Sequence, residues 1–368
     1  MRIIAAGHIC IDITPVFSTN TPCAAISDLL EPGKLIQMKG ADVHTGGSVA
    51  NTGLALKLLG ADVALMGKVG NDAFGAMVRD ILAQHGAEGL IVDETSATSY
   101  SVVLAIPGID RIFLHDPGAN NTFSNQDIPE EALENAALFH FGYPPLMKRM
   151  YENEGRELAF IFRRMKEKGI ATSLDMAAVD PASEAGKADW SKILKNVLPY
   201  TDFFLPSFEE LCFMLDREKY DRLSAAGEDM TRLLDMDRDV KPLADTCLHL
   251  GCKAVLIKCG TRGMYYRTAE ESALQMVGHR LKLDTAQWAD REGIQPCFRA
   301  DMVLSGTGAG DTSIAAYLAA VLQGKSPEAC AALAAAEGAC AVTAYDALSG
   351  LKPLDVLEAR IASGWETM

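Results

Sequence analysis

The sequence of 368 residues is poor in positive charge, with 34 lysines and arginines against 49 aspartates and glutamates and a formal charge of −15. A surface of this sign repels the phosphates of nucleic acids and of anionic membranes, so neither is an expected partner. The chain also lacks any uncharged apolar run near the ~20 residues that a bilayer span needs. We therefore expect a soluble protein that resides in the cytoplasm.

A disulfide or zinc framework is missing as well. The nine cysteines are an odd number, are thinly spread and include no C-x-x-C pair. Several lie in apolar stretches, such as Cys340 among alanines, which is typical of reduced core residues in a cytoplasmic protein. The first residues are interrupted by His8 and Asp12 too early for a signal peptide, so none is expected.

Four common catalytic signatures are absent. Gly67-Lys68 is followed by Val69, which excludes a P-loop, and no glycine spacing matches a dinucleotide fingerprint. Residues 46–50 end in alanine where a nucleophile elbow requires glycine, and there is no H-E-x-x-H zinc motif. Phosphoryl transfer without a P-loop remains as the candidate chemistry.

What the sequence does contain is an alternation of short apolar runs with helical patterns, which predicts an α/β fold with a mostly parallel sheet covered by helices on both faces. The expected strands are residues 2–6, 62–66, 101–106, 111–115, 138–141, 170–174, 202–205, 254–258 and 263–267. The expected helices are residues 48–59, 73–85, 154–168, 208–215, 311–323 and 327–343.

Two segments break this alternation. Prolines interrupt residues 13–45, and a hairpin turn is expected at Pro107–Asp110. We predict one domain over residues 1–368, with a small β-rich lid formed by approximately 13–45 and 98–120. The charged stretch 217–246 is expected to be a solvated helical insertion. Four polar residues in or next to the second lid segment can define the substrate, but they are more simply solvated hairpin residues and are given no role: Arg111, His115, Asn120 and Asn121.

The most informative motif is Gly306–Asp311, which precedes an apolar helix whose only charge is Asp311. Glycines before a helix let backbone N–H groups converge on one point, where the helix dipole also favours an anion. A carboxylate beside that point can accept the proton of an attacking alcohol. The same pattern also suits a tight turn with Asp311 as an ordinary helix-starting acid.

Two further elements carry polar groups at apolar positions. In the largely buried helix after Gly46-Gly47, Asn51 can face a cleft and bind a hydroxyl, although glycines used for packing and an internally satisfied Asn51 explain the pattern equally simply. Asp12, at the end of the first apolar strand, can bind two sugar hydroxyls or can be a turn residue.

Together these elements resemble the PfkB, or ribokinase-like, family of carbohydrate kinases over essentially the whole chain. Gly46-Gly47 with Asn51, continuing through residues 59–75, is similar to the family's first signature, and Gly308–Asp311 to its second. The resemblance implies a three-layer α/β/α sandwich with a small β lid. It also implies ATP and Mg²⁺ as cosubstrate and cofactor, with phosphate passed to an alcohol of a small sugar.

The resemblance implies roles residue by residue. Asp311 is the implied base, and the implied anion hole consists of Gly308, Ala309 and Gly310. The sugar would be held by Asp12, Gly46, Gly47 and Asn51. ATP would be contacted by Lys258, Gly260 and Thr261, and residues 336–342 would line the adenine pocket.

Three departures from the family pattern affect these expectations. Ser207 stands in the place of the usual asparagine near the phosphates, although Glu210 is kept and would bind the metal through water. Ser305-Gly306 replaces the usual Asp-Thr, which argues against activation by a monovalent cation. The residues after Asp175 lack the asparagine and arginine that often follow it in fructokinase-like and ketodeoxygluconate-kinase-like members, which weakens the case for either of those substrates.

The leading hypothesis is thus an ATP-dependent sugar kinase. A nucleoside kinase of the same family is the nearest alternative, because ribose diols make similar demands on Asp12 and Asn51. A sugar-sensing homologue without turnover is another, suggested by Ser207 and Ser305. Pairing of two lids through their strand edges makes a homodimer the expected assembly.

Overall fold

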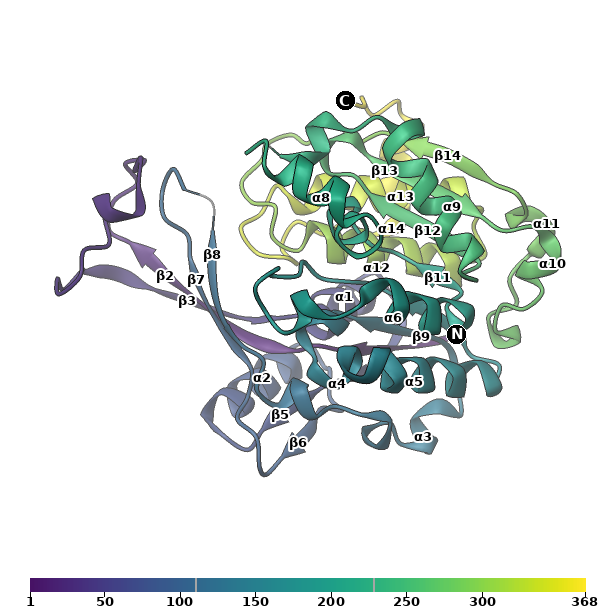
Figure 1. Cartoon of the computed structure of the whole chain (residues 1–368), viewed down its shortest axis with the longest axis horizontal. Coiled ribbons are helices and arrows are strands. Elements are labelled where there is room, and N and C mark those ends of the chain that lie inside the picture. The colour runs from purple at the N-terminus through teal and green to yellow at the C-terminus, as the bar shows by residue number, and fades with distance from the viewer. Residues whose placement is uncertain (110, 228) are drawn as a thin grey trace.

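The computed structural model describes residues 1–109, 111–227 and 229–368. Asp110, in the predicted hairpin turn, and Glu228, in the predicted insertion 217–246, lie outside the described residues. The body is built on a sheet of eight strands in the order β14-β13-β12-β11-β10-β9-β1-β4, and a second sheet projects from it (Figure 1).

The central sheet is parallel from β12 to β4, and its last two strands, β13 and β14, are antiparallel. The mostly parallel sheet that the alternating pattern predicts is therefore confirmed. Its strands are β1 (Arg2–Gly7), β4 (Asp62–Met66), β9 (Ala136–Gly142), β10 (Ala171–Leu174), β11 (Phe203–Phe204), β12 (Ala254–Lys258), β13 (Met264–Thr268) and β14 (Glu292–Gln295).

Helices cover both faces of this sheet because side chains alternate along each strand. Ile4 packs in the core on one face and Ile3 in the core on the other. The first face carries α4 (Lys148–Tyr151), α5 (Arg156–Glu167), α6 (Trp190–Val197), α7 (Phe208–Leu215) and α9 (Lys241–His249). The second carries α1 (Ser48–Leu58), α12 (Ala309–Leu322), α13 (Pro327–Ala341) and α14 (Leu354–Ala362).

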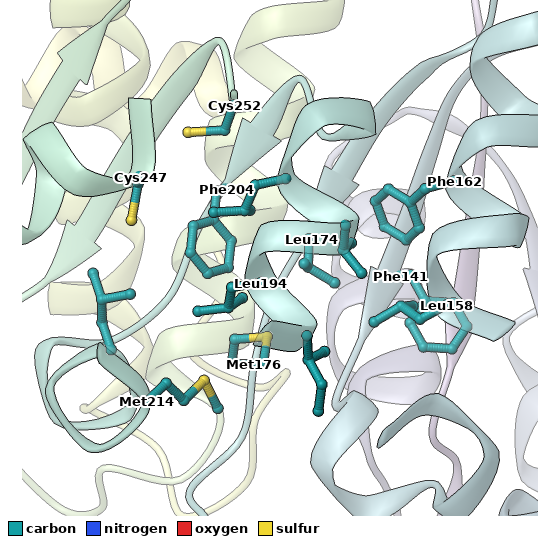
Figure 2. Close-up of a cluster of buried hydrophobic side chains, with 14 of the residues drawn as sticks. Phe141, Leu158, Phe162, Leu174, Met176, Leu194, Phe204, Met214, Cys247 and Cys252 are labelled. Atoms are coloured by element: carbon teal, nitrogen blue, oxygen red, sulfur yellow. The ribbon is translucent and has the colours of Figure 1, made fainter. Parts of the chain in front are cut away.

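The core of the first face is rich in large side chains, as Figure 2 shows. Phe162 of α5 meets Phe141 of β9 edge-on, with ring centroids 6.5 Å apart. Both rings are fully buried. Burial of one such side chain stabilises the fold by about 1.5–3 kcal/mol. This packing holds β9 in place, and the end of β9 carries one of the polar residues described below.

The smaller sheet, called the lid sheet here, consists of β3 (Met38–Gly46), β2 (Cys10–Phe17), β7 (Tyr100–Leu104) and β8 (Ile112–Asp116) in that order. β2 and β7 are parallel, and the other two pairs are antiparallel. In Figure 1 the lid sheet extends away from the body, with β2 continuing from β1. The small β-rich lid of the expected fold class is therefore present.

The junction between body and lid sheet is held by a buried amide. Asn120 is fully buried, accepts a hydrogen bond from the Ile9 N–H at 3.1 Å and donates to the Ile9 carbonyl at 2.9 Å. The prediction that Asn120 is a solvated hairpin residue is wrong, because the chain between β1 and β2 needs both of these bonds where it leaves the central sheet.

The remaining elements complete the layers. They are β5 (Lys68–Gly70), β6 (Ile91–Asp93), α2 (Ala73–Gln84), α3 (Glu130–Leu133), α8 (Arg217–Ser224), α10 (Glu271–Leu274) and α11 (Thr285–Trp288). Stretch 217–246 is helical as predicted, but it is not wholly solvated, because Val240 is fully buried in the core. All nine cysteines are unpaired, and no helix in the described part of the chain has the length and apolarity of a membrane span.

Candidate active site

The polar residues gather where the parallel strands end. β1, β9, β10 and β12 present their carboxyl ends at the same edge of the sheet, where ligands bind in open α/β folds. The amino-terminal ends of α1 and α12 meet at this edge, and these two helices pack against each other. The site is therefore assembled from segments that lie far apart in the sequence.

Asp311 lies in the first turn of α12 and is only 5% exposed. Its Oδ2 accepts a hydrogen bond from Asn51 Nδ2 at 3.0 Å, and its Oδ1 accepts one from Thr52 Oγ1 at 3.3 Å. The hydroxyl of Tyr143, at the end of β9, lies 2.7 Å from Oδ1 and 2.8 Å from Oδ2. Three neutral donors from two elements thus surround one carboxylate.

This environment determines the protonation of Asp311. Burial raises its pKa above the ordinary aspartate range, because a charged carboxylate is poorly solvated there. The hydrogen bonds from Tyr143 and Asn51 lower that pKa in part, as does the positive charge of Lys258. A carboxylate with a raised pKa is a stronger base when ionised, which suits proton abstraction from an alcohol.

The glycine motif next to Asp311 forms the start of α12. The helix begins at Ala309, so the predicted start at residue 311 is two residues late and Gly310 belongs to the first turn. Gly308 has φ +73°, and a Cβ there would lie 2.2 Å from Cβ of Ala347, so only glycine fits. The first N–H groups of a helix have no partner within the helix, so this end of α12 is suited to face an anion, although the Ala309 N–H donates to the Gly306 carbonyl at 3.4 Å.

The sugar-side prediction for Asp12 needs a correction in its local structure. Asp12 is not at the end of the first strand but inside β2, where it pairs in register with His44 of β3. The sequence shows one apolar run because β1 and β2 are separated only by His8 and Ile9. Burial raises the pKa of Asp12, and the Cys10 thiol donates to its Oδ1 at 3.3 Å.

Gly46 and Gly47 fit closely against this first segment. A Cβ on Gly46 would lie 2.1 Å from Asp12 Oδ2, so glycine is required for the carboxylate to lie over the backbone. Gly47 has φ +85°, and a Cβ there would lie 2.6 Å from the carbonyl oxygen of His8. Both glycines therefore serve close approach of the backbone, and α1 starts directly after them with Ser48.

Lys258, the last residue of β12, forms a buried ion pair. Its Nζ lies 2.8 Å from Asp175 Oδ1 and donates to the Leu205 carbonyl at 2.7 Å. Burial raises the pKa of Asp175, and the Lys258 ammonium acts against that rise. A Cβ on Gly310 would lie 3.8 Å from Lys258 Cε and 4.0 Å from its Nζ, so the end of this side chain lies beside the first turn of α12.

The predicted nucleotide turn follows directly. Gly260 and Thr261 lie in a short helical turn, Gly260–Arg262, and Thr261 is exposed. Gly260 has φ +53°, and a Cβ there would lie 2.6 Å from Oγ1 of Thr231. The insertion 217–246 therefore reaches the turn Gly260–Arg262, which its charged sequence did not indicate.

Ser207 and Glu210 cap α7 reciprocally. Glu210 Oε2 accepts the Ser207 N–H at 2.7 Å, and Ser207 Oγ accepts the Glu210 N–H at 3.3 Å. Ser207 also forms a β-bridge with Lys258, which places this helix start beside the ion pair. Ser305 accepts the N–H of Thr307 at 3.1 Å, within the loop that precedes α12.

Sequence reasoning missed Tyr143, Thr52 and the pairing of Asp175 with Lys258. A tyrosine between Gly142 and Pro144 at a strand end was the available signal for Tyr143, since its backbone lies in the left-handed region at φ 64°. Arg111 also has a contact that the sequence did not show: its guanidinium from the start of the β8 segment donates to Thr307 Oγ1. That bond joins the lid sheet to the loop before α12.

The arrangement offers a carboxylate that can act as a base, backbone amides at a helix start, a nearby ammonium group and further hydrogen-bonding side chains. Asp311 can accept a proton, the start of α12 can stabilise developing negative charge, and Lys258 adds a positive charge nearby. On the lid side, Asp12 and Asn51 are hydrogen-bonding groups suited to hydroxyls. These are the parts that in-line transfer of a phosphoryl group to an alcohol requires.

Comparison with known proteins gives consistent results. A family model described as "pfkB family carbohydrate kinase" matches residues 11–353. An uncharacterized sugar kinase of Archaeoglobus fulgidus is 25% identical over 305 residues, covering 81% of this chain and 98% of the relative. A probable fructokinase-4 of Arabidopsis thaliana is 25% identical over 331 residues, covering 88% and 83%.

Solved structures share the fold. A ribokinase of Arabidopsis thaliana, complexed with ribose and ATP, superposes with a TM-score of 0.69 at 19% identity, covering 97% of each chain. At this identity the likeness concerns the fold alone. It confirms a ribokinase-like α/β/α sandwich with a small lid.

Proposed function

The chain belongs to the pfkB family of carbohydrate kinases, and from that premise we propose that it transfers the γ-phosphate of ATP to a hydroxyl of a small carbohydrate with Asp311 as general base. The chain is a sugar kinase of this family by its match over residues 11–353. One observation carries the finer proposal: Asp311 lies at the start of α12 with a raised pKa, among hydroxyl and amide donors from α1 and β9.

The proposed step is an in-line displacement. The sugar hydroxyl oxygen forms a bond to the γ-phosphorus, the bond from that phosphorus to the bridging oxygen of ADP breaks, and the hydroxyl proton passes to Asp311. The amides of Gly308, Ala309 and Gly310 stabilise the charge on the transferred oxygens, and the dipole of α12 adds to this effect. Lys258, facing Gly310, contributes positive charge on the same side.

The sugar is proposed to lie between the lid sheet and α1. Asp12 accepts hydrogen bonds from two sugar hydroxyls, and Asn51 donates to or accepts from a third. Gly46 and Gly47 let the backbone lie directly against Asp12 and His8, since a Cβ at either position would collide with these residues, and so help to position Asp12 for the ring. The lid sheet excludes water when it closes, and its bond from Arg111 to Thr307 supports this closed arrangement.

ATP is proposed to lie on the other side, along Lys258, Gly260 and Thr261, with residues 336–342 of α13 and its end beside the adenine. The exposed turn Gly260–Arg262 leaves its edge open to a ligand. The ATP-bound ribokinase of the same fold supports the cosubstrate.

Magnesium fits this donor set. Mg²⁺ in kinases is held by one or two carboxylates, waters and the phosphates themselves, and not by a protein cage. Among the described residues no cage of three or more metal-ligating side chains is present. Glu210, whose second oxygen remains for a metal-bound water, is the proposed protein contact. Bound Mg²⁺ would neutralise charge on the β- and γ-phosphates. Ser305, in place of the family's aspartate, offers no carboxylate for a monovalent cation.

A homodimer is the proposed assembly. β8 is an edge strand of the lid sheet, and its Phe113 and Leu114 are 56% and 53% exposed. Exposed apolar residues on an edge strand favour pairing with another strand. Light scattering after size exclusion tests this proposal, and a monomer at micromolar concentration would contradict it.

The test of the function is ADP release with MgATP over a panel of sugars and nucleosides. We expect a sugar to stimulate release, and Asp311→Asn to abolish the stimulation. Stimulation by nucleosides alone would instead favour the nucleoside kinase, and sugar-dependent thermal stabilisation without any ADP release would favour a sensor.

A further inference from the structure

The hydroxyl of Tyr143 occupies a particular position on Asp311. It lies almost equally far from the two carboxylate oxygens, at 2.7 and 2.8 Å, so its single hydrogen is shared between them. Asn51 and Thr52 each bind only one of these oxygens. The edge between the two oxygens is thus covered by Tyr143.

A general base must offer a free lone pair to its substrate, and the contacts of Asn51, Thr52 and Tyr143 engage both oxygens of Asp311. A carboxylate has about four lone-pair sites, and an alcohol that gives up its proton must approach one of them to within hydrogen-bond distance. With Asn51, Thr52 and Tyr143 in place, an acceptor hydroxyl reaches Asp311 at this edge only by displacing the phenol. Tyr143 therefore stands where the acceptor hydroxyl is needed.

The backbone around Tyr143 is built to hold this side chain. Tyr143 has φ 64° and ψ 42°, a conformation that non-glycine residues rarely adopt and that costs about 1–3 kcal/mol. Gly142 before it has no room for a side chain, because a Cβ would lie 1.9 Å from Ser48 Oγ. Pro144 and Pro145 follow and have fixed φ angles. With the backbone fixed, only rotation of the side chain can uncover Asp311.

From this geometry we propose that Tyr143 is a further residue of the acceptor site, whose hydroxyl holds the acceptor position on Asp311 and gives it up only to a bound sugar. Water alone lacks the contacts to Asp12 and Asn51 that would compensate for displacing the phenol. Tyr143 thereby selects a sugar hydroxyl over water. This inference depends on the proposed role of Asp311 as base.

The reaction that Tyr143 suppresses is ATP hydrolysis. If water took the phenol's place, its oxygen would bond to the γ-phosphorus, the bond to ADP would break and a proton would pass to Asp311. Tyr143 itself keeps its proton: burial and the negative charges of Asp311, Asp175 and Glu210 raise its pKa. The positive charge of Lys258 lowers the pKa of Asp311.

The experiment measures ADP release from MgATP in the absence of any acceptor. We expect Tyr143→Phe to raise this release about tenfold. This increase is smaller than the ~10²–10⁴-fold rate enhancement that a positioned base contributes. Fructose and ribose serve as acceptor probes, and KM for the accepted sugar should fall because no phenol has to be displaced. Tyr265→Phe is the matched control, since it removes a phenol–carboxylate bond to Glu292 of 2.9 Å on the far strands β13 and β14.

The outcomes separate the two proposals. Unchanged sugar-independent ADP release in Tyr143→Phe, with Asp311→Asn inactive toward sugar, overturns the role of Tyr143 alone. Full sugar phosphorylation by Asp311→Asn overturns the proposed function instead. If Tyr143→Phe does not fold, a crystal structure of the native chain with the accepted sugar decides: the phenol within hydrogen-bond distance of both Asp311 oxygens overturns the inference, and a sugar hydroxyl in its place supports it.

Discussion

Asp311 and Asp175 are two neighbouring buried aspartates that are stabilised in different ways. They are 5% and 2% exposed, and burial raises the pKa of both. Asp311 is surrounded by the neutral donors Tyr143, Asn51 and Thr52. Asp175 instead pairs with the ammonium of Lys258 at 2.8 Å.

The difference bears on what each group can do. A neutral hydroxyl can be exchanged for the hydroxyl of a substrate whose other contacts compensate for the exchange, because one hydrogen bond replaces another. A buried ammonium cannot leave its carboxylate without leaving an unpaired charge, which is strongly unfavourable. Asp311 is therefore suited to act on a substrate, whereas Asp175 is suited to fix Lys258.

The largest expected effect comes from Asp311→Asn. Loss of the proposed base should lower kcat for sugar phosphorylation by about 10²–10⁴-fold. The melting temperature should stay close to that of the native chain, because the amide replaces a charge whose burial is costly. Coupled ADP release and thermal unfolding measure both. A variant with near-native kcat would contradict the claim that Asp311 acts on the substrate.

Asp175→Asn should act mainly on stability. It leaves Lys258 buried without its counter-charge, which costs about 3–5 kcal/mol in comparable cases. Urea unfolding should show this loss, and the double variant Asp175→Asn/Lys258→Met should recover much of it by removing the unpaired ammonium. If Asp175→Asn unfolds like the native chain, the two aspartates do not differ in the way described.

Gly46→Ala extends the comparison to the sugar side. The added Cβ would lie 2.1 Å from Asp12 Oδ2, so the Asp12 carboxylate must move. Loss of a hydrogen bond to a charged group costs about 1.5–3 kcal/mol, so KM for the sugar should rise at least about tenfold. KM for ATP in the same variant is the internal control, and an equal rise in both constants would speak against a sugar-side role.

The smallest effect concerns pH. Because the base must be ionised and burial raises the pKa of Asp311, kcat/KM should fall with decreasing pH through a value above the ~3.9 of an ordinary aspartate. Asp311 does not cause unfolding in that range: its raised pKa contributes stability that is complete at low pH and lost as pH rises. Melting temperatures over the same pH range provide the check, and an acid limb that follows unfolding would refute the assignment.

Much of the fold could be predicted because periodicity and turn residues act locally. The strand at 62–66 and the helix at 208–215 have the predicted bounds. β2 and β3 were not resolved as strands, because prolines and polar residues conceal an exposed sheet whose order comes from pairing with β7. The start of α12 was placed late, because Gly310 is a poor helix former that this first turn tolerates.

The site was less accessible to sequence reasoning, since its contacts span large separations. Asn51 and Asp311 were singled out by polar residues in apolar helices, and the structure brings them within 3.0 Å. Tyr143 had only a weaker signal, its place between Gly142 and Pro144, because a tyrosine at a strand end is usually a packing residue. The contact from Lys258 to Asp175 joins two strand ends that are not neighbours in the sheet, so neither local sequence indicates it.

The two hydrogen bonds between Asn120 and Ile9 limit how the lid sheet can open. They clamp the root of the lid sheet, and Asp12 is only three residues further along β2. Any opening of the lid sheet must therefore bend the far ends of its strands, while Asp12 stays in place near the fixed base of the sheet. If Asp12 binds the sugar as proposed, binding can precede closure of the lid sheet, and the two become separate steps of the proposed reaction.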